Sequence, residues 1–134
     1  MNDARSVFFL ILAVMLIQLP GGLTGTLTPL ALGELGVGPV GIGTIAALHA
    51  AGCMLGSWTS PPALRQFGNV RLYAVATGLL AASFLVLALA QHSLLWALMR
   101  FGQGILFAWV FTSIESWLGA AVPAKARGNL VGLY

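Results

Sequence analysis

The positions of the charged residues constrain this chain more than any other feature of its sequence. Only nine of its 134 residues are Asp, Glu, Lys or Arg, and they leave the stretches 6–33, 35–64 and 72–99 uncharged. Each stretch exceeds the roughly 20 apolar residues that a helix needs to cross the hydrocarbon core of a bilayer. With 59% hydrophobic and 7% charged residues, the composition excludes a water-soluble monomer and a disordered chain. The sequence therefore predicts an all-α membrane protein.

A fourth apolar stretch, 94–120, contains Arg100 and Glu115. An arginine near the middle of a helix costs about 2.5–3.5 kcal/mol to insert, and each Leu, Ile, Phe or Val offsets roughly 0.3–0.6 kcal/mol. Residues 94–114 contain ten such residues, and together they offset about 4 kcal/mol. We therefore expect four membrane spans, at about 7–31, 40–60, 71–91 and 94–119.

Proline and glycine predict where these helices end or bend. Ser60-Pro61-Pro62 is expected to end the second helix, because proline lacks the backbone N–H and disfavours helical geometry in the residue before it. Pro20-Gly21-Gly22 lies inside the first span and is expected to kink or locally unwind it. A fifth span is expected to begin near residue 128, so residues 1–134 are interpreted as an incomplete N-terminal transmembrane domain.

The basic residues predict the orientation of the spans. If the N-terminus is cytoplasmic, the two outer loops contain no Lys or Arg, and the cytoplasmic side contains Arg5, Arg65, Arg71, Lys125 and Arg127. This asymmetry is the positive-inside signal, and four spans then place both ends of the segment in the cytoplasm. The basic residues form no cluster of the kind that binds nucleic acid, so no nucleic-acid partner is expected.

Polar residues inside the spans are functional candidates, because each one costs insertion free energy. They are Gln18, His49, Arg100 and Gln103, on three different spans. Arg100 is the leading candidate, because arginine stays protonated and must find an anion, carbonyl groups or water. Structural alternatives stay open for all four. Arg100 could serve in structural pairing, His49 could bond to a backbone carbonyl, and the two glutamines could bond between helices.

Small residues predict how the second and fourth spans pack. They recur every fourth residue along one helix face, as Gly52, Gly56 and Ser60 in the second span and as Gly104, Ala108 and Thr112 in the fourth. This spacing lets two helices approach closely. The third span has only Thr77 and Ser83 as polar residues and is expected to face lipid.

No arrangement of residues predicts an enzyme, a cofactor site or a metal site. The two histidines are far apart in the sequence, and Cys53 is the single cysteine. The glycines do not form a phosphate-binding loop.

Three segments resemble conserved signatures of the major facilitator superfamily of transporters. The signature of the loop between spans two and three is similar to residues 56–60 (GSWTS) and 65–71 (RQFGNVR). The span-four signature is similar to residues 100–104 (RFGQG). A little-characterised branch of the family is similar in carrying E…RG…Y, here Glu115, Arg127-Gly128 and Tyr134. The loop signature normally includes a carboxylate, which is missing between Gly56 and Arg71.

The resemblance implies the first third of a twelve-helix transporter that works by alternating access, often with proton coupling. The implied partners are the lipid bilayer of a bacterial inner membrane, a small-molecule substrate and the remaining C-terminal helices. The residues implied to line the substrate or coupling cavity are Arg100, Gln103, His49 and Gln18. The residues implied to form a cytoplasmic gating loop and charge clamp are Gly56, Arg65, Gly68, Arg71, Glu115 and Arg127.

Two other classes of membrane protein stay open. A small four-helix multidrug exporter would act as an oligomer, but such exporters carry a membrane-embedded carboxylate in the first helix, and residues 6–33 contain none. A non-transporting membrane subunit would use the same polar residues only for packing.

Overall fold

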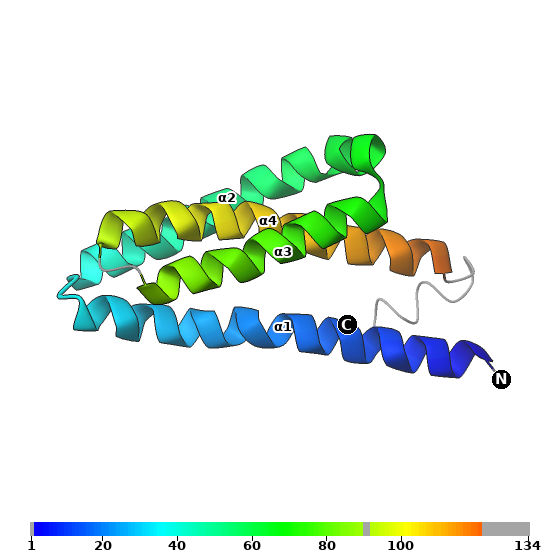
Figure 1. Cartoon of the computed structure of the whole chain (residues 1–134), viewed down its shortest axis with the longest axis horizontal. Coiled ribbons are helices and arrows are strands. Elements are labelled where there is room, and N and C mark those ends of the chain that lie inside the picture. Colours follow the sequence, from blue (N-terminus) through cyan, green and yellow to red (C-terminus); the bar gives the residue numbers. More distant parts are fainter. Residues whose placement is uncertain (1, 90–91, 122–134) are drawn as a thin grey trace. The chain divides into compact units, whose positions relative to one another are not determined.

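The computed structural model describes residues 2–89 and 92–121, which form four helices and no strand (Figure 1). The helices are α1 (Asn2–Glu34), α2 (Pro39–Phe67), α3 (Asn69–Leu89) and α4 (Ser93–Ala121). Among the described residues, α2, α3 and the part Ser93–Trp117 of α4 are long and apolar enough to cross a membrane. The prediction of an all-α fold is confirmed, and the chain is an integral membrane protein. The fifth span expected near residue 128 lies outside the described residues.

The chain divides into two compact units, Met1–Ile42 and Gly43–Tyr134. The first unit contains α1, and the second contains α3, α4 and most of α2. Each unit is described by itself.

Helix α1 runs without interruption through Pro20-Gly21-Gly22, so the predicted local unwinding is wrong (Figure 1). Proline removes only one backbone donor, and hydroxyl groups nearby can supply further bonds to the backbone. The Thr24 hydroxyl donates to the carbonyl of Pro20 and lies 3.1 Å from that of Gly21. Both contacts lie in the turn that follows the proline, which is helical.

Helix α2 continues beyond Ser60-Pro61-Pro62, so the predicted end at residue 60 is also wrong. The two prolines leave the carbonyls of Ser57 and Trp58 without their usual backbone donors. The Ser60 hydroxyl donates to the Ser57 carbonyl at 3.0 Å and replaces one of the lost bonds. A serine directly before the prolines therefore helps the helix to pass through them.

Gly68 is the residue that ends α2. Its φ of +76° lies in the left-handed region, where glycine is unstrained, and is typical of the residue that follows a helix. Its N–H donates to the Leu64 carbonyl at 2.9 Å, and its own carbonyl accepts from Leu72 at 3.1 Å. Gly68 thus closes α2 and opens α3 within a single residue.

Helices α2 and α4 pack backbone against backbone through their small residues. A Cβ atom on Gly104 would fall on the carbonyl oxygen of His49, and one on Gly52 would meet the α4 backbone in the same way. A Cβ atom on Gly56 would lie 2.8 Å from the Cβ atom of Ala108. The close approach predicted from the spacing of small residues is confirmed.

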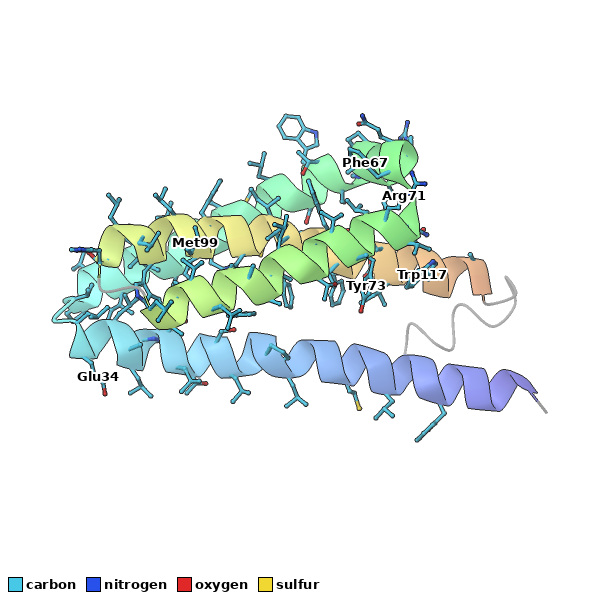
Figure 2. The ribbon with its side chains drawn as sticks, viewed as in Figure 1. Glu34, Phe67, Arg71, Tyr73, Met99 and Trp117 are labelled. Atoms are coloured by element: carbon cyan, nitrogen blue, oxygen red, sulfur yellow. The ribbon has the colours of Figure 1, made fainter. Side chains whose placement is uncertain are left out.

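Two polar contacts extend these packed surfaces toward the ends of α2 and α3. On the α2 side, Trp109 Nε1 donates to the Thr59 hydroxyl at 3.0 Å. On the α3 side, Asn69 Nδ2 donates to the Ser116 hydroxyl at 2.9 Å. The rings of Tyr73 and Trp117, labelled in Figure 2, lie beside that second bond with centroids 5.5 Å apart.

We expect Gly104→Ala to destabilise the protein and Gly102→Ala to leave its stability nearly unchanged. The added methyl group at position 104 meets the α2 backbone, whereas position 102 has open space around it. Overpacking of this kind costs about 1–3 kcal/mol. Thermal unfolding of the two purified variants in the same detergent measures the difference, and equal midpoints would contradict the backbone contact.

Candidate functional site

Arg100 is the centre of the polar cluster in the second unit. It lies on α4 next to Met99, which Figure 2 labels, and only 7% of its surface is exposed. Its Nη1 donates to Oε1 of Gln103, one turn along the helix, at 3.1 Å. Its Nε is buried and has no hydrogen-bond partner among the described residues. The guanidinium is therefore held by a neutral amide and retains a buried donor for a further group.

Glu115 cannot neutralise Arg100, although both lie on α4. Fifteen residues separate them in the sequence, which is about 22 Å along a helix axis. Glu115 is also exposed, whereas Arg100 is buried. The charge of Arg100 thus has no counter-ion on its own helix.

Gln103 connects Arg100 to α3. Its side chain is 2% exposed, and its Nε2 donates to the Ser83 hydroxyl at 2.9 Å. Ser83 in turn donates to the Leu80 carbonyl at 2.7 Å. The third span was expected to face lipid, and through Ser83 it is also part of the polar cluster.

The contact between Ser83 and Gln103 is hard to predict from the sequence. A serine inside a helix usually bonds back to a carbonyl of its own helix, and Ser83 does so as well. Its second contact depends on which face of α3 meets α4, and a span with an apolar residue at nearly every position does not specify that face.

His49 binds the cluster from α2. Its Nδ1 lies 3.0 Å from the backbone carbonyl oxygen of Arg100, and because a carbonyl only accepts, Nδ1 carries the hydrogen. Its Nε2 faces the Cys53 Sγ atom at 3.8 Å, one turn along α2. The structure thus shows the backbone bond that was the structural alternative for His49.

The four residues predicted to line a cavity are only partly brought together. Arg100, Gln103 and His49 lie in one hydrogen-bonded cluster that also includes Ser83. The Gln18 side chain lies outside the described part of the chain, so its place in a cavity stays a prediction.

The residues predicted to form the cytoplasmic gating loop have different structural roles. Gly56 lies inside α2 and packs on α4, and Gly68 is the turn between α2 and α3. Arg65 is in the last turn of α2 and Arg71 in the first turn of α3, and both are exposed. Arg127 lies outside the described residues.

Among the described residues Glu115 makes no ion pair with Arg65 or Arg71, and Arg127, the third arginine of the predicted charge clamp, lies outside them. The ends of the helices are nevertheless held together. Ser116, the neighbour of Glu115, accepts the bond from Asn69, which is two residues before Arg71. The clamp therefore stays a prediction.

Comparisons with known proteins agree with the resemblance to the major facilitator superfamily. The model of the MFS_1 like family matches residues 2–134. An uncharacterized MFS-type transporter of Enterobacter sp. (strain 638) is 27% identical over 131 residues, which cover 98% of this chain and 34% of that protein. The uncharacterized MFS-type transporter YcaD of Escherichia coli O45:K1 (strain S88 / ExPEC) is 26% identical over 130 residues, which cover 97% of this chain and 34% of YcaD. The chain thus spans about a third of the length of these relatives, and no solved structure matches it significantly.

We expect His49→Asn to retain more stability than His49→Leu. The asparagine amide can donate to the Arg100 carbonyl in place of Nδ1, whereas leucine offers no donor. The loss of one interhelical bond is worth about 1 kcal/mol. Thermal unfolding in detergent compares the two variants, and an equal loss in both would show that the bond contributes nothing.

Proposed function

We propose that this chain, which belongs to the MFS_1 like family, is the N-terminal part of a secondary transporter that moves a small molecule by alternating access. Two relatives that match nearly the whole chain are named MFS-type transporters, which supports this assignment. The family match over residues 2–134 favours it over a small four-helix exporter. The proposed location is a bacterial inner membrane, with both ends of the segment in the cytoplasm.

The observation that carries the proposal is the buried Arg100 with its unpartnered Nε. Insertion of a charged arginine at the centre of a membrane helix costs about 2.5–3.5 kcal/mol. A neutral side chain would serve packing without that cost. We therefore assign Arg100 the binding of an anionic group, either on the substrate or on a side chain whose protonation couples transport to protons.

Gln103 and His49 support that role from either side of Arg100. Gln103 bonds to Nη1 through a neutral oxygen, so the charge of the guanidinium is not neutralised and attracts an anion to its unpartnered Nε. His49 fixes the backbone of Arg100 through its carbonyl. Gln18 belongs to the other unit, and its role stays a prediction from the sequence.

The exposed residues Arg65, Arg71 and Glu115 are proposed to close the transport path on the cytoplasmic side. Arg65 and Arg71 flank the Gly68 turn, and the bond from Asn69 to Ser116 brings the start of α3 to the helix turn that carries Glu115. Pairing of Glu115 with these arginines and with Arg127 in one transport state would form the clamp.

We expect an anionic small molecule to raise the midpoint of thermal unfolding of the full-length protein. A ligand at 100 times its dissociation constant stabilises the folded state by about 2.7 kcal/mol. The measurement uses panels of anionic, neutral and cationic small molecules. Arg100→Gln should abolish the rise, whereas Arg5→Gln, which removes the same charge near the N-terminus, should retain it.

Flux of the stabilising anion into reconstituted vesicles then tests transport. We expect Arg100→Gln to insert normally and to lose flux at least about a hundredfold, as expected when a charged binding partner worth roughly 3 kcal/mol is removed. Normal flux in that variant would contradict the role of Arg100.

A charge exchange tests the clamp. We expect Glu115→Arg and Arg71→Glu to lower flux singly, because each places like charges together, and the double variant to recover part of the loss. Additive losses in the double variant would rule out pairing between these two positions.

A further inference from the structure

We infer that Ser83 on α3 is a positioning residue for Arg100, and that it acts through the amide of Gln103. The inference rests on the proposed function, because it concerns how the guanidinium is held ready for an anion. It assigns a role to α3 that its apolar sequence does not indicate.

Each hydrogen bond in the chain from Arg100 to α3 can have only one direction. Arginine only donates, so the atom of Gln103 that faces Nη1, at 3.1 Å, must be the oxygen Oε1. The Ser83 hydrogen is directed at the Leu80 carbonyl, 2.7 Å away, which only accepts. The Ser83 oxygen must therefore accept from Gln103 Nε2, at 2.9 Å.

Ser83 thereby selects one of the two orientations of the Gln103 amide. If the amide turned over, its NH₂ group would face the guanidinium and its oxygen would face a hydroxyl whose hydrogen is already used. Only 2% of the Gln103 surface is exposed, so water cannot supply hydrogen bonds to a reversed amide. Donation thus runs in one direction, from Arg100 Nη1 through the Gln103 amide and the Ser83 hydroxyl to the Leu80 carbonyl.

These hydrogen bonds hold the guanidinium of Arg100, while a separate bond holds the backbone of Arg100. His49 on α2 donates to the Arg100 carbonyl, and Ser83 on α3 holds Nη1 through Gln103. Nε stays buried and unpartnered in this arrangement. The guanidinium is therefore held in one orientation, and an anion that binds it need not first order the side chain.

Thr77 provides a matched control on the same helix. Its hydroxyl donates to the Tyr73 carbonyl at 2.8 Å, as that of Ser83 does to Leu80, but it is exposed. Loss of the Thr77 hydroxyl removes a bond within α3 and leaves the Gln103 amide in place.

The first experiment measures rotation of the guanidinium in the full-length protein without ligand. In protein labelled with ¹⁵N at the arginine side chains, the Arg100 signals are assigned by their loss in Arg100→Lys. We expect separate Nη1 and Nη2 signals in the wild type, Thr77→Ala and Ser83→Thr, which keeps the hydroxyl. In Ser83→Ala the signals should merge, because rotation about the Nε–Cζ bond becomes up to about tenfold faster when one hydrogen bond is lost. Slow rotation retained in Ser83→Ala would overturn the inference.

The second experiment is a pair of double-mutant cycles by thermal unfolding. We expect Ser83→Ala and Arg100→Gln to be non-additive, and Thr77→Ala and Arg100→Gln to be additive. Additivity in both cycles would also overturn the inference. If Ser83→Ala does not accumulate, Ser83→Cys takes its place in both experiments, because its sulfur is only a weak acceptor.

These readouts need no substrate, so they separate this inference from the proposed function. If no anion stabilises the protein, the proposed function fails, while merged signals and coupling would still show that Ser83 positions Arg100. If an anion binds through Arg100 but Ser83→Ala leaves rotation unchanged, the proposed function stands and the role of Ser83 is rejected.

Discussion

The direct contact between the backbones of α2 and α4 is the constraint on which the polar cluster depends. Helices in lipid gain little from burying apolar side chains against each other, so close packing and hydrogen bonds hold them together. Gly52 and Gly104 remove the side chains that would separate the two helices. Only at that distance can His49 on α2 reach the Arg100 carbonyl on α4. The polar cluster around Arg100 thus depends on the two glycines, which have no side chain.

The sequence predicted the helices and this packing well, because both follow from patterns that repeat along the chain. Charge-free stretches mark the apolar segments, and small residues at every fourth position mark the face that α2 and α4 share. The Gln103 side chain was correctly given an interhelical hydrogen bond as its structural alternative. These signals are strong because each spans several turns of a helix.

The errors fell on single residues whose role depends on their neighbours in space. Pro61 was expected to end α2, but Ser60 supplies a donor to a carbonyl that the prolines leave free, and the end moves to Gly68. Ser83 was overlooked because its partner, Gln103, is on another helix. In both cases the structure depends on a hydrogen bond of one serine hydroxyl, and helix periodicity in the sequence does not predict such a bond.

The one-residue connection at Gly68 has a mechanical consequence. Because α2 ends at Phe67 and α3 begins at Asn69, there is no slack between the two helices. In the proposed transport cycle, any twist or tilt of α2 must be absorbed by the torsion angles of Gly68 or be passed on to α3 as a lever. Through Ser83, that lever reaches the amide that holds Arg100. The joint between α2 and α3 would therefore connect movement at the membrane surface with the charge inside the membrane.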